Sequence, residues 1–258
     1  MTAALVQATY LTRRALDRAI RQPGHIFFAL VFPMVFLFVV SGGLDRAAHL
    51  PGFPADSFLA FALAIPFVHG GLFVAINAAV ELGRDIETGF LNRLALTPAR
   101  SVPLVLGHLL AAAALGVGQA LVYLGVGTLA GVRLESGLLG VPVILALAAL
   151  ASLAFGSLGT AIALRTGNSE SVQGLFPVFF VALFLSSMVM PRHLIEADWF
   201  RAIATLNPVS YLIEGLRSLV IAGWDGQALA LAFGCGTALV AAALAASAAA
   251  FGERMTRT

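Results

Sequence analysis

The sequence contains no lysine, and all 15 of its basic residues are arginine. Without lysine the chain cannot form the G-x-x-x-x-G-K-[ST] phosphate-binding loop of P-loop ATPases or a Schiff base with a carbonyl substrate. A single cysteine, Cys235, excludes an internal disulfide and a cysteine metal cluster. The five histidines are dispersed, with no H-E-x-x-H pattern, and no nucleophile elbow is present. We therefore expect neither a catalytic residue nor a metal site.

Charge of either sign is also scarce. Charged residues make up 11% of the chain and hydrophobic residues 60%, whereas a soluble domain has about 25% and about 45–50%. Six stretches of 17 to 29 residues contain no charge at all, and a helix needs about 20 apolar residues to cross ~30 Å of hydrocarbon. The sequence predicts an all-α membrane protein of one domain, 1–258, with six transmembrane helices at residues 26–42, 58–80, 102–130, 138–164, 171–190 and 227–252.

The distribution of arginine predicts the orientation, because cytoplasmic loops carry the excess of positive charge. With the N-terminus inside, ten arginines fall in cytoplasmic segments and five in outer ones. We therefore expect both termini in the cytoplasm and no nucleic acid as a partner. A cleaved signal peptide is the alternative for the first stretch, but its basic region would be 25 residues long, so we interpret the stretch as a retained span.

Two segments outside the spans have helical periodicity. Residues 4–22 place apolar side chains at intervals of three and four, with Arg14, Arg18 and Arg21 opposite. This pattern predicts an amphipathic helix at the membrane interface with its basic side toward anionic lipid; a soluble helix or a disordered tail is the alternative. Residues 81–101 hold six charges and an apolar stripe that includes Phe90, Leu91 and Leu94, and they end at Thr97-Pro98. That stripe requires a partner surface, either the membrane interface or another protein.

The outer connection, residues 191–226, is too apolar for a solvated loop and too polar to span. Asn207-Pro208 is a turn signal that divides it into two amphipathic halves. We expect two short helices that dip into the outer leaflet, with Glu214 and Arg217 close enough to pair on one helical face.

Polar side chains within the spans are few. His69 and Asn77 are the strongly polar residues of the second span, and a structural role is expected for both. Whether His69 and His108 have a function is not decided by the sequence. Proton-coupled carriers usually place acidic or basic side chains inside their spans. Because these spans have none, uphill transport would need an external energy source.

Two motifs carry a resemblance to a known family. Residues 81–101, with Glu87-Thr88-Gly89, Arg93-Leu94 and Thr97-Pro98, are similar to a charged cytoplasmic segment of the ABC-2 type ABC transporter permeases, although the family order is Glu-x-Gly-Thr. The run Asn207-Pro208-Val209-Ser210-Tyr211, followed by Glu214 and Arg217, resembles the Asn-Pro-x-[ST]-Tyr…Glu-x-x-Arg signature of the same family. That family includes drug, nodulation-factor and polysaccharide exporters of the bacterial cytoplasmic membrane.

The resemblance implies partners and roles. Such permeases pair with a second permease chain and sit on two ABC ATPase subunits, which bind the ATP and Mg, so no cofactor is expected on this chain. Membrane lipid surrounds the spans. Residues 81–101 would be the coupling helix, and Asn207, Pro208, Tyr211, Glu214 and Arg217 an outer gate or re-entrant motif. The expected ATPase-coupling residues are Glu81, Arg84, Asp85, Glu87, Thr88, Gly89, Phe90, Leu91, Arg93, Leu94, Thr97 and Pro98.

The resemblance also implies export through a pathway at the dimer interface, bordered by the second and fifth spans. Asn77, Phe179, Phe184 and Met188 are candidate lining residues, although plain packing is common for such side chains. Charge-free spans favour a drug, a lipid or a lipid-linked glycan as substrate. Two alternatives are a self-sufficient secondary carrier or channel, and a non-transporting membrane scaffold that uses the outer helix pair as a docking surface.

Overall fold

The computed structural model describes residues 2–89 and 101–256, and all regular elements in these ranges are helical. Six helices are long. They are α1 (Thr2–Ile20), α2 (Pro23–Leu44), α4 (Ala64–Glu87), α6 (Ser101–Leu129), α7 (Gly140–Thr166) and α12 (Gly226–Thr256). The short elements are η1 (Asp45–His49), α3 (Phe58–Ala62), α8 (Ser169–Gln173), α9 (Phe176–Phe184), η2 (Arg192–Leu194), α10 (Asp198–Leu206) and α11 (Pro208–Ile221).

Five of the helical segments in the described ranges are long and apolar enough to cross a membrane, which fits an all-α membrane protein. The count of six spans is not confirmed. The predicted span at 171–190 is not one continuous helix, because α8 ends at Gln173 and α9 ends at Phe184. Pro177 lies in the first turn of α9, where its missing N–H and fixed φ are tolerated but would disrupt a helix continuing from α8.

Helix α4 occupies the centre of the bundle. It packs against α2, α6, α7 and α8, and 89% of the residues in its most apolar stretch are buried inside the protein. The corresponding figures are 28% for α2 and 17% for α12. These two helices therefore lie at the periphery, where their exposed apolar side chains suit contact with lipid or another helix.

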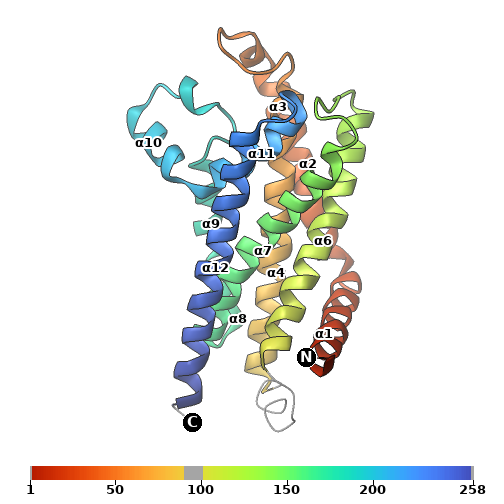
Figure 1. The fold of residues 1–258 in the computed structure, drawn as a ribbon, viewed down its shortest axis with the longest axis vertical. Helices are drawn as coiled ribbons and strands as arrows, with labels where there is room; N and C mark the ends of the chain where they lie inside the picture. Colours follow the sequence, from red (N-terminus) through yellow and green to blue (C-terminus); the bar gives the residue numbers. More distant parts are fainter. Residues whose placement is uncertain (1, 90–100, 257–258) are drawn as a thin grey trace.

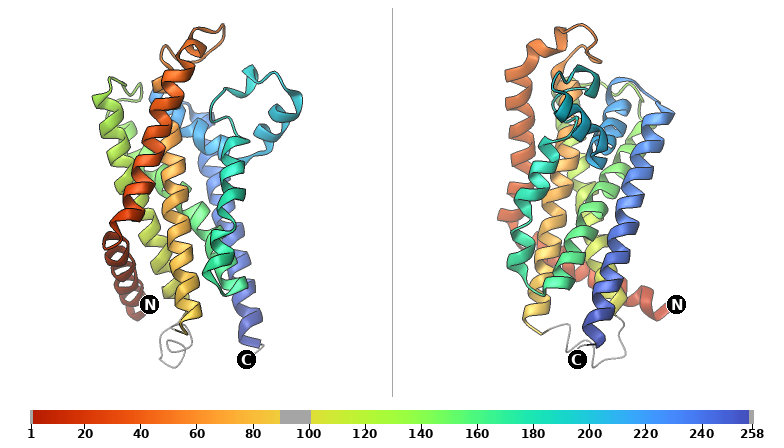
Figure 2. Two further views of the ribbon diagram at one scale, coloured as in Figure 1. Left: turned by 180° about the vertical axis from the view of Figure 1, so that it is seen from behind. Right: turned by 90° about the vertical axis from the view of Figure 1, so that its left-hand side faces the viewer.

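The two ends of the bundle differ (Figure 1). Both chain termini, α8 and the end of α4 lie at one end, which we call the terminal end. The α10 end carries α10, η1 and the connection between α6 and α7. Helix α1 runs obliquely across the lower half of the bundle, beside α6 (Figure 2).

The contacts of α1 correct one prediction. Arg14 and Arg18 do not face lipid, because both guanidinium groups reach the Asp85 carboxylate on α4. Arg13, whose side chain is 80% exposed, is on the outward side of the same helix. The periodicity of residues 4–22 correctly predicted a helix. It could not show that a buried acid elsewhere would attract part of the basic face.

Candidate functional site

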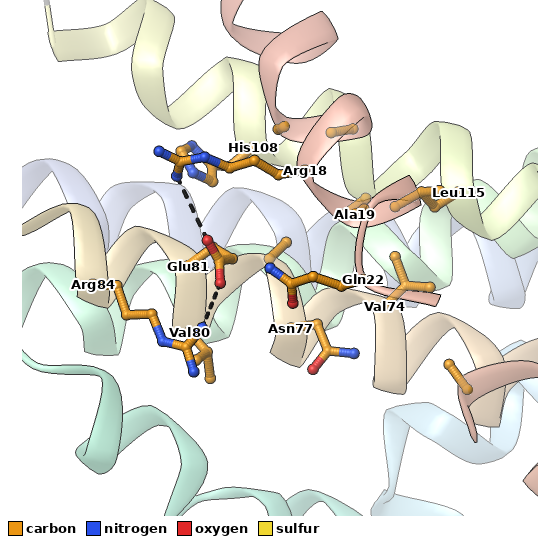
Figure 3. Close-up of a pocket in the computed structure, with 15 residues that line it drawn as sticks. Arg18, Ala19, Gln22, Val74, Asn77, Val80, Glu81, Arg84, His108 and Leu115 are labelled. Carbon is orange, nitrogen blue, oxygen red and sulfur yellow. Dashed lines mark hydrogen bonds and ion pairs between the residues drawn. The ribbon is translucent and has the colours of Figure 1, made fainter. Parts of the chain in front are cut away.

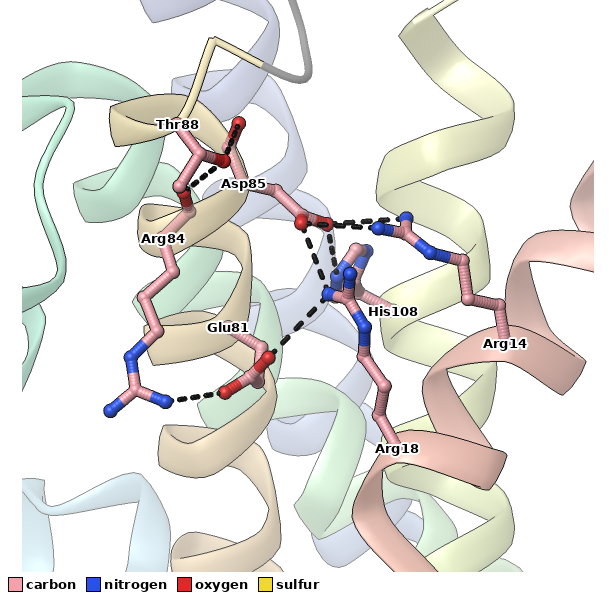
Figure 4. Close-up of polar contacts among 7 residues, drawn as sticks. All are labelled: Arg14, Arg18, Glu81, Arg84, Asp85, Thr88 and His108. Carbon is pink, nitrogen blue, oxygen red and sulfur yellow. Dashed lines mark hydrogen bonds and ion pairs between the residues drawn. The ribbon is translucent and has the colours of Figure 1, made fainter. Parts of the chain in front are cut away.

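Asp85, near the terminal end of α4, is the centre of a cluster of charged side chains (Figure 4). The residue is only 4% exposed. Its carboxylate accepts hydrogen bonds from Arg14 at 3.3 and 3.4 Å and from Arg18 at 3.0 Å. Nε2 of His108, on α6, lies 3.7 Å from the same carboxylate. A buried charge requires such partners, so this carboxylate holds α1 and α6 against α4.

Glu81 extends the cluster by one helical turn. Its carboxylate lies 3.5 Å from Arg18 and accepts a 2.7 Å hydrogen bond from Arg84. Glu81 and Asp85 are four residues apart on α4, as Arg14 and Arg18 are on α1, and this spacing places each pair on one helical face. Two acids on α4 thus oppose two arginines on α1, which fixes the register between the helices.

Glu87 connects the last turn of α4 to α8. Its carboxylate accepts hydrogen bonds from the backbone N–H of Ser169 at 2.6 Å and from the Ser169 hydroxyl at 3.0 Å. The Asn168 side chain caps α8 by accepting from Ser171 N–H at 2.7 Å. Helix α4 ends at Glu87, and two residues later Gly89 has a φ of +68° that favours glycine. The end of α4 is therefore held on two sides, by α1 and by α8.

These contacts divide the residues that the sequence assigned to ATPase coupling. Asp85 faces inward and is satisfied within the chain, whereas Arg84, Glu87 and Thr88 are exposed. Thr88 also donates its hydroxyl to Arg84 O. Phe90, Leu91, Arg93, Leu94, Thr97 and Pro98 lie outside the described residues, so their role stays a prediction.

Gly83 permits the close approach of α4 and α8. A Cβ atom at this position would lie 2.8 Å from Cα of Ser169 and 2.9 Å from its backbone N. Because the obstacle is backbone, we expect Gly83→Ala to separate the two elements and destabilise the fold by about 1–3 kcal/mol. Thermal unfolding measured in detergent tests this expectation. Gly118→Ala, which meets nothing within 4 Å, is the control, and an equal melting temperature in the two variants would contradict the proposed packing role.

At the α10 end, Arg217 on α11 is almost completely buried, with 5% exposure. Its guanidinium donates to three backbone carbonyls, those of Phe61 at 3.1 Å, Ser187 at 3.0 Å and Met188 at 2.8 Å. It also stacks 3.5 Å from the centroid of the Phe61 ring. Phe61 lies near the junction of α3 and α4, and the other two carbonyls lie in the irregular segment after α9. Arg217 therefore supplies hydrogen-bond donors to backbone carbonyls at places where a regular helix ends.

The expected pairing of Glu214 with Arg217 is wrong. Glu214 instead forms a 2.5 Å ion pair with Arg192, and the Arg192 guanidinium lies 4.7 Å from the Tyr211 ring centroid. Partial burial opposes the charged form of Arg192, but the Glu214 carboxylate outweighs that effect and raises the pKa of Arg192. The three-residue spacing along α11 places Glu214 and Arg217 near each other. The sequence could not show that the Arg217 guanidinium would instead bind three backbone carbonyls of other segments.

The remaining residues of this motif also bind backbone. Asn207 donates its amide to the carbonyls of Ala182 and Leu185 at 2.6 and 2.9 Å, and its side-chain oxygen caps α11 through Val209 N–H. Ser210 accepts a hydrogen bond from Ser187 N–H at 3.0 Å. Tyr211 donates to Thr205 O at 2.8 Å.

Irregular backbone at membrane depth is stable only when its polar groups are satisfied within the protein. In this chain, Asn207, Ser210 and Arg217 satisfy five backbone groups between Ala182 and Met188. The motif therefore explains how the apolar segment after α9 can leave the helical conformation without leaving its carbonyls and amide unpaired.

The four candidate pathway residues are not brought together. Asn77 lies beside α1 near the terminal end, and Phe179 contacts Phe155 of α7. Met188 is fully buried and presents its carbonyl to Arg217. Phe184 is exposed and contacts Phe36 and Phe180. It belongs to a group of aromatic side chains on α2, α4 and α9, comprising Phe28, Phe32, Phe36, Phe73, Phe176, Phe180 and Phe184.

Sequence reasoning missed several residues that complete these sites. Arg192, Ser169 and His108 were not identified as partners, because each meets its contact across a long separation in sequence. A usable signal existed only for the α1–α4 contact, where pairs of opposite charge recur at a four-residue interval. In the described part of the chain, no three His, Cys, Asp or Glu side chains group as metal ligands would.

Comparison with known proteins gives a consistent result. A family model described as ABC-2 type transporter matches residues 6–221. Two similar proteins come from Mycobacterium tuberculosis strains CDC 1551 and ATCC 25618, and both are named probable doxorubicin resistance ABC transporter permease protein DrrC. Each is 26% identical over 219 residues, which cover 85% of this chain and 78% of the relative.

Proposed function

Because the chain belongs to the ABC-2 type transporter family, we propose that it is the membrane-spanning permease subunit of an ATP-driven exporter in a bacterial cytoplasmic membrane. Two copies, or this chain and a close relative, form the membrane part, and two ABC ATPase subunits bind ATP and Mg on the cytoplasmic side. The complete lack of lysine supports this division, because a P-loop requires one. The substrate is apolar or amphipathic: a drug, a lipid or a lipid-linked glycan.

The terminal end is the cytoplasmic end in this proposal, and residues 81–101 transmit the ATPase movement. The observation that carries the assignment is the anchoring of the end of α4, where Asp85 binds α1 and Glu87 binds α8. A force applied just after Glu87 would therefore move three elements together. Because α4 continues through the buried centre of the bundle, that movement would reach the α10 end.

The aromatic group on α2 and α9 supports the pairing of two permease chains. Phe28 and Phe184 are exposed there, as are the neighbouring Val178 and Val181 of α9. A second copy would cover this apolar face and leave a pathway between the chains. An aromatic lining suits a flat or apolar substrate.

Co-expression with a candidate ABC ATPase tests the proposal. We expect a stable complex from the wild-type chain and its loss when Phe90 and Leu94 are both replaced with Glu, since two charges would enter an apolar contact. The matched control replaces Leu138 and Leu139 with Glu. These residues are 87% and 78% exposed at the α10 end, and this variant should retain the complex, as measured by co-purification.

A complex that survives the Phe90 and Leu94 changes would refute the coupling assignment. Solute flux in proteoliposomes that contain this chain alone would refute the dependence on an ATPase and favour the secondary carrier. The scaffold alternative predicts that nucleotide causes no movement of the spans, which distance measurements between spin labels on α2 and α12 would reveal.

A further inference from the structure

A pocket opens between α1 and the bundle at the terminal end (Figure 3). Its space is about 710 Å³, including the part open to solvent, and its walls come from α1, α2, α4 and α6. The aromatic face of α2 and α9 contributes no wall, so the pocket is separate from the proposed export pathway.

A few polar side chains, which we call the polar half, line one part of the otherwise apolar pocket. Gln22, in the connection between α1 and α2, and Asn77 of α4 both line the pocket and are labelled in Figure 3. Within the described residues neither side-chain amide has a hydrogen-bond partner. Arg84 is about half exposed, and Glu81 takes one of its five N–H donors. The polar half therefore offers hydrogen-bond donors that the protein itself does not use.

The charges of this region favour an anion. Arg14, Arg18 and Arg84 give three positive charges against two negative charges from Glu81 and Asp85, a balance of +1 with His108 neutral. Glu81 is the one carboxylate that lines the pocket, and two arginines already bind it. A cationic ligand would find no free counter-charge, whereas a phosphate oxygen could accept from Arg84, which binds such groups well.

The other half is apolar and hollow because its side chains are small. Its lining includes Ala29, Ala111 and Ala112, together with Val74 and Leu115. This lining accepts an alkyl chain. The pocket also lies next to α1, at the end of the spans, where lipid headgroups meet water.

From this arrangement we propose that the pocket binds a membrane lipid with a phosphate-bearing headgroup. The phosphate lies between Arg84, Gln22 and Asn77, and one acyl chain enters the space lined by alanine. A lipid headgroup and a free phosphate ion would present the same anionic phosphate to this site. Because the rest of the lining is apolar and would accept an alkyl chain, we assign the site to the lipid. The bound lipid fills the gap between α1 and α4 beside the Asp85 cluster.

Native mass spectrometry of the purified full chain tests this, with titration of three probes in detergent. The probes are dioleoylphosphatidylglycerol, dioleoylglycerol without phosphate, and inorganic phosphate. We expect the phospholipid to bind at least tenfold more tightly than the other two. Arg84→Gln should weaken it about tenfold, the loss of one charged hydrogen bond. Ala111→Leu should also abolish retention, because the added side chain occupies the alkyl space.

Two controls distinguish this site from general lipid contact. Arg13→Gln removes an exposed charge from α1, and Ala114→Leu adds the same side chain on the exposed side of α6; both should bind as the wild type does. Equal binding by lining variants and controls would mean annular lipid only and would overturn the proposal. Phosphate binding as tight as that of the phospholipid, and unaffected by Ala111→Leu, would overturn it in favour of a free anion. Neither result would alter the ATPase co-purification that tests the proposed function.

Discussion

Replacement of Arg217 by Met is expected to reduce the amount of folded protein severely, with a loss of about 3–5 kcal/mol in stability. Met has a similar length but no donor, so the carbonyls of Phe61, Ser187 and Met188 would lose this partner in an apolar environment. Each buried carbonyl left unsatisfied costs about 1–3 kcal/mol. The melting temperature in detergent and the monodisperse yield would measure the effect.

Arg217→Lys should be almost as harmful, although it retains the positive charge. A lysine ammonium is a compact group on a flexible stem and cannot span three separated carbonyls or stack on the Phe61 ring as a planar guanidinium does. The control is Arg133→Met, at an exposed position of the same end. If Arg217→Lys melted at the wild-type temperature, charge rather than the geometry of the three hydrogen bonds would be the requirement.

Asp85→Asn is the second change with a large expected effect. It removes the negative charge that two guanidinium groups and His108 share in a buried place. Removal of one partner from a buried ion pair typically costs about 3–5 kcal/mol. We expect α1 to separate from α4, which limited proteolysis within α1 would detect, together with a lower melting temperature.

A double-mutant cycle separates the ion cluster from a general effect of the substitution. Arg18→Gln in the Asp85→Asn background should cost much less than in the wild type, because the two side chains interact directly. Asp17→Asn is the matched control on α1. Its carboxylate is exposed and lies 4.0 Å from Arg13, so its loss should change stability by less than about 1 kcal/mol. Additive effects of the Asp85 and Arg18 changes would contradict the cluster.

The sequence predicted those parts of the fold that depend on local pattern. Stretches without charge predicted the regions of α2, α6, α7 and α12, whereas α4 runs from Ala64 to Glu87 and not over the predicted 58–80. Asn207-Pro208 correctly marked the boundary between α10 and α11. The broken helix at 171–190 was less predictable, since its composition is as apolar as that of a true span. What stabilises the break is a set of side chains more than twenty residues later, including Asn207 and Arg217.

The candidate sites show the same limit. The charged residues near the end of α4 were identified from the sequence. Which of their side chains point into the bundle was not, because that depends on which neighbouring helix packs there. Asp85 was expected to face a partner protein and instead binds Arg14 and Arg18. Contacts between residues 67 and 71 positions apart follow from tertiary packing, which a periodicity argument along one helix does not contain.

The position of Arg217 also has a consequence for biosynthesis. The carbonyls it binds belong to Phe61, 156 residues earlier, and to Ser187 and Met188, 30 and 29 residues earlier. A ribosome makes the chain from its N-terminus, so all three carbonyls are synthesised before their donor. Their hydrogen bonds to Arg217 can therefore form only after α11 has been made. Assembly of the α10 end is consequently completed only after residue 217 has been made.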